Sequence, residues 1–234
     1  MGNSKKVIVR NLGSVDFEES FKIQKQIQNE IIDIKLNNRK NNLNLSTPNY
    51  LLFMQHNHVY TLGNSGNSDN LLFDKNKLDE KGIKYLKTNR GGDITYHGPG
   101  QLVCYPIIDL ENFYRDIHKY LRDLEEIIVE TLIYFGIKAS GNTNETGVWL
   151  DVGDKTERKI CAMGIKVSRW VTMHGLALNV NTDLSYFKGI IPCGINNKGV
   201  TSISKELNKK INIDLVIEVL LKNFQNKFNV LIEN

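Results

Sequence analysis

Cys193 stands in a sequence context that suits a nucleophile. It lies between Pro192 and Gly194, outside any periodic segment. Proline fixes the backbone before it, and glycine leaves the backbone after it open to a substrate. A cysteine reacts as its thiolate, so a nearby cation or base must lower its pKa. The alternative is an inert buried thiol, as we expect for Cys104 and Cys161, which lie inside apolar runs. The candidate activating groups are Lys159, Lys166, His97 and His174.

Lys159 opens a short apolar segment with strand character, residues 160–164. A lysine at the mouth of an apolar strand can be partly desolvated, which suits the counter-cation of a thiolate or a proton shuttle. The alternative is a solvated lysine at a strand end. Because Lys159 and Cys193 are far apart in the chain, spacing alone leaves both interpretations open.

A glycine-rich stretch, residues 90–100, lies between two runs with strand character. Glycine lets another chemical group approach the backbone closely, because it has no Cβ and tolerates positive φ. A hairpin turn needs only about two to five residues, so we interpret the longer stretch as one wall of a ligand site. A surface loop is the alternative. The polar groups interleaved with its glycines are Arg90, Asp93, Thr95, Tyr96 and His97.

Three further histidines lie in apolar surroundings. His174 lies among small and apolar residues, where it lines an apolar tunnel or is an ordinary histidine of the core. His56 and His58 are two residues apart in the expected strand 50–62, so their side chains should face the same side. That spacing can bind a metal, but no further ligand is evident, and we expect no metal site.

Hydrophobic periodicity predicts the elements that position these residues. Helices are expected at 17–34, where Asp16 provides the N-cap, and at 116–135, where Gly136 provides a C-terminal cap. Residues 37–49 read as a solvated connection. The interleaving of strands and helices, together with hairpin-like pairs, favours a mixed sheet covered by helices over a doubly wound parallel sheet. Further helices are expected at 72–81 and 213–228, a helical turn at 184–191, and strands at 7–9, 50–62, 82–88, 102–108, 148–150, 159–167 and 171–180.

Composition narrows the class of protein. The chain has 234 residues, of which 41% are hydrophobic, which fits one large domain or at most two small ones. A net charge of +4 is far from the signature of a nucleic-acid-binding protein. Three widely spaced cysteines argue against a disulfide scaffold and favour a reducing compartment. Neither a membrane-spanning run nor a signal peptide is visible, so a cytoplasmic location is expected, or a mitochondrial one if the source is eukaryotic.

Four segments, in this order and spacing, resemble the lipoyl(octanoyl) transferases. This resemblance extends from about Val7 to Leu207. It implies an α/β (α+β) fold, a mixed sheet flanked by helices, similar to the catalytic domain of lipoate and biotin protein ligases, formed by residues 1–234 as a single domain. The segments are Arg90-Gly91-Gly92-Asp93-Ile94-Thr95-Tyr96-His97-Gly98-Pro99-Gly100-Gln101-Leu102, Arg158-Lys159-Ile160-Cys161-Ala162-Met163-Gly164, Met173-His174-Gly175-Leu176-Ala177-Leu178-Asn179 and Ile191-Pro192-Cys193-Gly194-Ile195.

The resemblance also implies an activity. The family moves an octanoyl group from octanoyl-acyl carrier protein to a lysine on the lipoyl domains of 2-oxoacid dehydrogenase E2 subunits and on the glycine cleavage H protein. By motif position, Cys193 would carry the acyl thioester and Lys159 would lower its pKa, without ATP in the first transfer and without a cofactor. The residues expected to line the substrate site are Arg90, Gly91, Gly92, Asp93, Ile94, Thr95, Tyr96, His97, Ala162, Met163, Gly164, Gly175, Leu176, Ala177 and, by a weaker match, His56.

Three other functions stay open at this point. An ATP-dependent ligase of the related fold would activate lipoate or biotin as an adenylate and would not need Cys193. A non-catalytic binder of lipoyl domains would form no thioester. A cysteine thioesterase would pass the acyl group to water and not to an amine.

Overall fold

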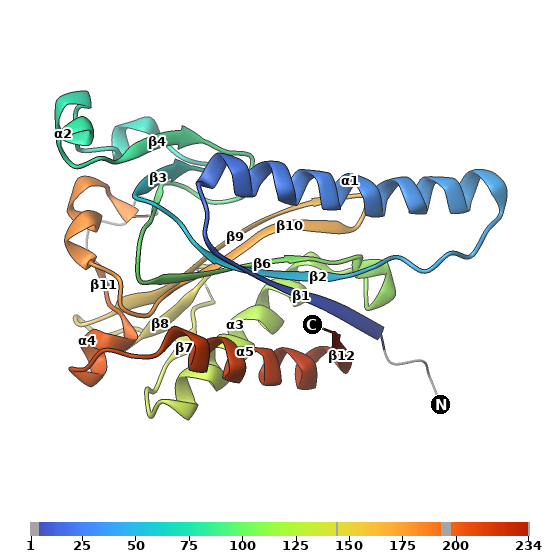
Figure 1. The fold of residues 1–234 in the computed structure, drawn as a ribbon. Helices are drawn as coiled ribbons and strands as arrows, with labels where there is room; N and C mark the ends of the chain where they lie inside the picture. The colour runs from blue at the N-terminus through green and yellow to red at the C-terminus, as the bar shows by residue number, and fades with distance from the viewer. Residues whose placement is uncertain (1–4, 144, 193–197, 234) are drawn as a thin grey trace.

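A mixed β-sheet forms the centre of the molecule (Figure 1). The computed structural model describes residues 5–143, 145–192 and 198–233. The middle of the sheet is antiparallel, whereas β12, β1 and β2 run parallel at one edge and β11 runs parallel to β9. The strand order is β12 (Val230–Glu233), β1 (Lys5–Ser14), β2 (Tyr50–Gln55), β6 (Gln101–Ile107), β10 (Val171–Asn179), β9 (Arg158–Ser168), β8 (Val148–Leu150) and β7 (Ser140–Gly141), with β11 (Gly199–Val200) beside β9.

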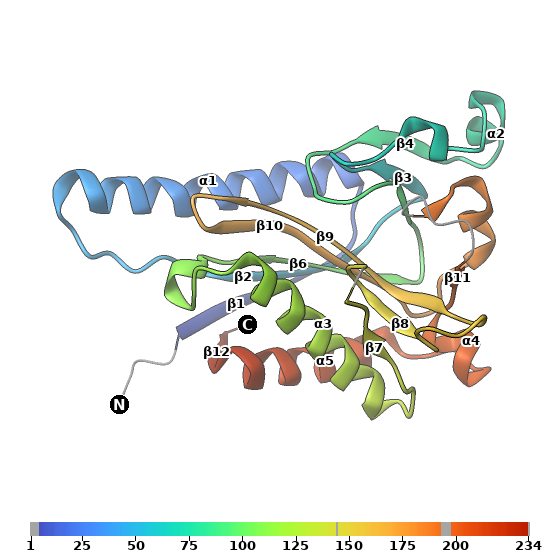
Figure 2. The same cartoon turned by 180° about the vertical axis from the view of Figure 1, so that it is seen from behind.

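Helices cover both faces of this sheet (Figures 1 and 2). The long helix α1 (Phe17–Asn41) lies on one face and packs on β10 and β6. The helices α3 (Ile117–Tyr134) and α5 (Ile213–Phe228) lie side by side on the other face and enclose the larger hydrophobic core. In the described part of the chain, no helix is both long and apolar enough to cross a membrane.

A second, smaller sheet lies beside the main one, beyond the N-terminal end of α1. Tyr60, Tyr96 and Phe187 form the centre of its own hydrophobic cluster. Its strand order is β4 (Lys84–Lys87), β3 (Val59–Leu62) and β5 (Thr95–His97). The remaining helical segments are α2 (Lys75–Glu80), α4 (Ile203–Leu207), η1 (Ser68–Asn70), η2 (Leu110–Asn112) and η3 (Leu184–Gly189).

The fold class predicted from the sequence is confirmed: the sheet is mixed and helices flank it. The last helix begins and ends where the periodicity predicts. Asp16 accepts a hydrogen bond from the Glu18 amide and caps α1 as expected, and Gly136 follows α3 with a φ of +75°.

Three expectations about local structure were wrong. The helix predicted at 17–34 continues to Asn41, because Lys35 forms a buried ion pair with Asp109 that fixes the next turn. The strand predicted at 50–62 is two strands, β2 and β3, which belong to different sheets. His56 and His58 therefore lie in the connection between sheets and share no strand face. The stretch 90–100, for which a surface loop was the alternative to a wall of a ligand site, contains the short strand β5.

Candidate active site

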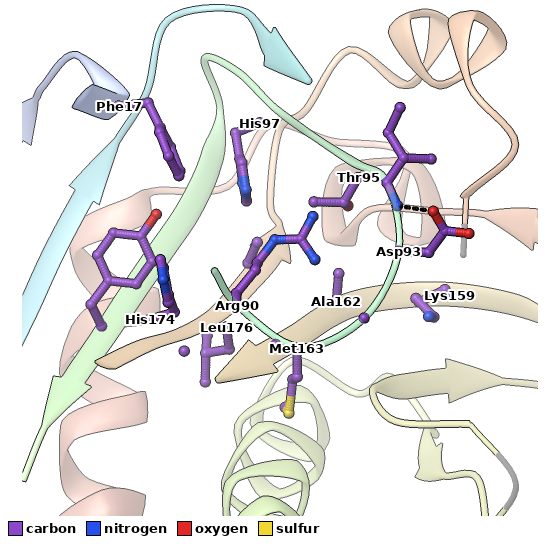
Figure 3. Close-up of a pocket in the computed structure, with 16 residues that line it drawn as sticks. Phe17, Arg90, Asp93, Thr95, His97, Lys159, Ala162, Met163, His174 and Leu176 are labelled. Atoms are coloured by element: carbon purple, nitrogen blue, oxygen red, sulfur yellow. Dashed lines mark hydrogen bonds between the residues drawn. The ribbon is translucent and has the colours of Figure 1, made fainter. Parts of the chain in front are cut away.

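A pocket lies between the β9–β10 hairpin and the glycine-rich segment 90–97, on the face of the sheet that α1 covers (Figure 3). Most residues predicted for the substrate site meet here, although they come from three distant parts of the chain. Gly91, Tyr96 and His56 do not line it. Those that line it are Arg90, Gly92, Asp93, Ile94, Thr95, His97, Lys159, Ala162, Met163, Gly164, Gly175, Leu176 and Ala177, together with Phe17, Tyr105 and His174.

The floor of the pocket is the paired strands β9 and β10. Ala162 lies opposite Ala177, and Gly164 lies opposite Gly175, so two of the sequence motifs are in direct register. Successive side chains of a strand point to opposite faces. Accordingly, Ala177 belongs to the cluster beneath α1, whereas Leu176 and Met163 pack in the core with α3 and α5. The side chains of Leu176 and Met163 therefore face away, and these residues contribute mainly their backbone to the pocket.

Two glycines of the floor are required by close backbone approach. A Cβ on Gly175 would lie 2.3 Å from the Cys104 carbonyl oxygen of β6. A Cβ on Gly164 would lie 2.6 Å from the carbonyl oxygen of Gly91. The Gly91 amide in turn donates to the Ile165 carbonyl at 2.9 Å. Gly91 therefore acts through its backbone, attaching the glycine-rich segment to β9.

The opposite wall is held by hydrogen bonds of its own polar side chains. The Arg90 guanidinium is buried and donates to the Thr61 side chain at 2.9 Å and to the Gly91 carbonyl at 3.0 Å. It also donates to the Thr61 carbonyl, in the neighbouring strand β3. Asp93 accepts from its neighbour Ile94 and from the Asn67 amide, which ties the wall to the preceding loop. These side chains line the pocket while they fix the backbone around it.

His97 is a neutral imidazole with a defined tautomer. The Gln101 amide nitrogen donates to the Asn179 side chain at 3.0 Å and to the Tyr96 carbonyl at 3.1 Å, so its oxygen is the acceptor that faces His97. His97 Nδ1 therefore carries the proton and donates to Gln101 at 2.8 Å. Burial lowers the pKa of His97 well below its usual value, and the nearby His56 and Arg90 lower it further.

His56 and Tyr96 lie behind the pocket. His56 Nδ1 donates to the Val15 carbonyl at 2.7 Å, and its Nε2 accepts from the Tyr105 hydroxyl at 2.9 Å. Burial lowers the pKa of His56, so this ring is also neutral. The Tyr96 hydroxyl is bonded to His58 at 2.8 Å within the cluster of the small sheet. Both residues support lining residues from behind.

His174 was predicted as a candidate activating group for Cys193 and as a residue of an apolar tunnel or of the core, and the structure places it in the pocket wall with Phe17 and Tyr105. Its Nε2 is bonded to the Asn89 side chain at 2.8 Å. Burial lowers the pKa of His174 to about 3, assisted by the positive charges of Arg90 and Lys166. The signal that points to His174 in the sequence is a histidine among small residues. Phe17 and Tyr105 carry no such signal, because each resembles an ordinary aromatic residue of the core.

Lys159 lines the pocket at the side away from His174 (Figure 3). It is buried, with 8% of its surface exposed, and its ammonium lies 4.3 Å from the centre of the Trp149 ring. A small adjoining hollow is lined by Lys159, Ala162, Ala177 and Pro192 among others. Pro192 immediately precedes Cys193, which itself lies outside the described residues. The burial of Lys159 excludes the alternative of a solvated lysine at a strand end.

The other two cysteines are buried in the core beneath α3 and α5. Burial raises the pKa of both the Cys104 and Cys161 thiols. Neither cysteine is among the described residues that line the pocket. Both are therefore inert core thiols, as their sequence context indicates.

Solved structures share this fold. The structure of a putative lipoate protein ligase from T. acidophilum superposes with a TM-score of 0.70 at 17% identity, over 97% of this chain and 87% of the other. A lipoate-protein ligase A bound with ATP superposes with the same score at 16% identity, over 99% and 88%. At these identities the likeness shows the fold alone: the architecture is that of the lipoate protein ligases.

Closer similarity appears in the sequence. The profile of the lipoyl protein ligase A/B catalytic domain matches residues 19–225. An octanoyltransferase of Christiangramia forsetii is 56% identical over 96% of this chain and 97% of its own length. One from Flavobacterium johnsoniae is 53% identical over the same shares. The chain therefore belongs to the octanoyltransferases of the lipoyl protein ligase A/B family, and it is an acyltransferase.

Proposed function

We propose that this enzyme transfers an octanoyl group from octanoyl-acyl carrier protein, through a thioester on Cys193, to the target lysine of lipoyl domains. The observation that carries the proposal is the position of Lys159. It is buried in the wall of an apolar pocket, and it shares the adjoining hollow with Pro192, the residue before Cys193. A cation at that position suits the thiolate that Cys193 must become.

In the first transfer, the Cys193 thiolate attacks the thioester carbonyl of the donor. A new C–S bond forms, the donor's C–S bond breaks, and the carrier's thiolate leaves with a proton from the Lys159 ammonium. One thioester replaces another of similar energy, so this step needs no ATP. The octanoyl chain lies over Ala162 and Ala177, whose small side chains leave the floor open.

In the second transfer, the neutral amine of the target lysine attacks the thioester of Cys193. A C–N bond forms, the C–S bond breaks, and a proton must leave the amine. His97 and His174 are weak proton acceptors, because burial lowers the pKa of both. We therefore assign the proton to Lys159, left neutral by the first transfer.

The partners and the organisation of the chain follow the same proposal. We propose that residues 1–234 act as one catalytic domain. The acceptors are the lipoyl domains of 2-oxoacid dehydrogenase E2 subunits and the glycine cleavage H protein. These reactions would take place in the cytoplasm.

Mass spectrometry of the intact protein tests the proposal. After mixing with octanoyl-acyl carrier protein without ATP, we expect an adduct with the mass of one octanoyl group, located on Cys193 by peptide mapping. Cys104 and Cys161 provide internal controls, because their buried thiols should stay unmodified. Added lipoyl domain should discharge the adduct and gain the same mass on one lysine.

Other outcomes would contradict the proposal. Activity that needs ATP and survives Cys193→Ala would indicate a ligase. Release of free octanoate would indicate a thioesterase, and binding of the lipoyl domain without any adduct would indicate a binder.

A further inference from the structure

His174 departs from the alternation of the strand that carries it. Val171 and Ala177 of β10 pack beneath α1, and Leu176 and Leu178 pack on the opposite face. By this pattern His174 would face α3 and α5. It contacts α1 instead: its ring centre lies 5.8 Å from that of Phe21, and its amide donates to the Gln24 side chain at 3.0 Å.

The backbone of His174 accounts for this turn. Its φ is +60°, in the left-handed region that costs a residue with a Cβ about 1 kcal/mol or more. The ring that results is nearly fully buried, with Nε2 bonded to Asn89. Strain of this kind persists where the surroundings fix it, and it gathers at ligand sites.

His174 separates two hollows. On one side is the pocket that contains Lys159. On the other is a groove between α1 and the β9–β10 hairpin, where the apolar side chains of Phe21, Ile32 and Met173 lie among polar and charged ones. Asn89 and Phe21, which hold the imidazole, both line this groove. The imidazole is thus the partition between the pocket and the groove.

The dimensions suit an end wall. His174 lies three residues along β10 from Ala177, which lines the hollow next to Pro192, and this separation corresponds to about 10 Å at the rise of a strand. Eight carbons of an extended chain advance about 10 Å, given the length of a C–C bond. With the thioester at one end and the imidazole at the other, the floor accommodates such a chain. Burial keeps the ring uncharged, so that it can meet an alkyl terminus.

We propose that the His174 imidazole is the end wall that limits the length of the acyl chain, and that the groove beyond it is a closed extension of the pocket. This inference rests on the proposed function. A chain longer than octanoyl meets the imidazole. When the ring is absent, the chain passes between β10 and α1 into the groove.

Competition between donors tests this. The protein is mixed with equal amounts of octanoyl-, decanoyl- and dodecanoyl-acyl carrier protein, and the adducts on Cys193 are counted by mass spectrometry. Wild type should carry octanoyl. His174→Gly removes the ring and relieves the positive φ, and the ratio of dodecanoyl to octanoyl adduct should rise at least tenfold, since each additional buried methylene contributes about fourfold in affinity.

Two further variants keep the test decisive. His174→Phe restores a ring without a hydrogen-bonding nitrogen, so it should keep the octanoyl preference. Asn89→Ala releases the imidazole without altering β10, so it should shift the ratio in the same direction by a smaller factor, and it serves if His174→Gly does not fold.

A folded His174→Gly protein with the wild-type adduct profile would overturn the inference, as would a His174→Phe protein that behaves like His174→Gly. Either result leaves the proposed function standing, because octanoyl adducts would still form. A wild-type protein without any octanoyl adduct would instead refute the proposed function.

Discussion

The floor and the wall of the pocket are held by different kinds of hydrogen bond. The floor is two hydrogen-bonded strands whose pocket-facing positions carry Ala162, Gly164, Gly175 and Ala177. The wall, residues 90–97, is held by buried polar side chains bonded to backbone and to one another. Polar residues of a glycine-rich motif therefore shape the site here, and the small residues leave space for the ligand.

Glycine-to-alanine changes should separate the two regions most strongly. Gly175→Ala on the floor places a Cβ 2.3 Å from the Cys104 carbonyl, so β10 and β6 must move apart. We expect a loss of more than about 3 kcal/mol of unfolding free energy, or no folded protein. Gly91→Ala in the wall meets nothing closer than 3.4 Å and should cost less than about 1 kcal/mol. Urea denaturation measures both, and equal losses would contradict the distinction.

Arg90→Ala tests the hydrogen bonds of the wall. The change leaves the Thr61 and Gly91 carbonyls without the guanidinium, inside the protein. We expect about 2–4 kcal/mol of destabilisation in urea, because buried acceptors lose their donors. Arg39→Ala is the control: its side chain is 68% exposed and its ion pair with Glu111 is long, so less than about 0.5 kcal/mol should be lost.

The sequence predicted the floor better than the wall. Strands 159–167 and 171–180 follow from apolar runs, and their small residues mark a surface that a ligand can approach. The wall depends on Thr61 and Asn67, which are distant from the motif, and on Gln101 near its end. No local pattern indicates that Arg90, Asp93 and His97 are hydrogen-bonded to these residues. For His174 the sequence left a tunnel residue and a core histidine as alternatives, because alternation along the strand places it on the opposite face and only its backbone conformation turns it toward α1.

The histidines of the wall should make stability depend on pH. The unfolded chain binds a proton at each histidine below a pH of about 6.5, whereas folded His97 stays neutral because its pKa is lowered. The unfolded state therefore gains protons as the pH falls, and stability decreases by up to about 1.4 kcal/mol per pH unit for each such residue. Urea titrations between pH 7 and pH 5 should show a smaller slope for His97→Gln than for wild type. An unchanged slope would mean that His97 is protonated in the folded enzyme.

The smallest effect on stability is expected for Ala162→Val on the floor. This change should alter substrate binding instead. Ala162→Val adds two methyl groups on the pocket side of β9, where the strand accepts a β-branched residue and free space receives it. We expect less than about 1 kcal/mol change in unfolding free energy, no change in the pH slope, and a KM for octanoyl-acyl carrier protein raised about tenfold. Met163→Leu is the matched control on the next residue, because its side chain faces α3 and α5 and the exchange conserves volume. An equally raised KM in both variants would show that the effect does not depend on which face of β9 is changed, and the assignment of the floor would be wrong.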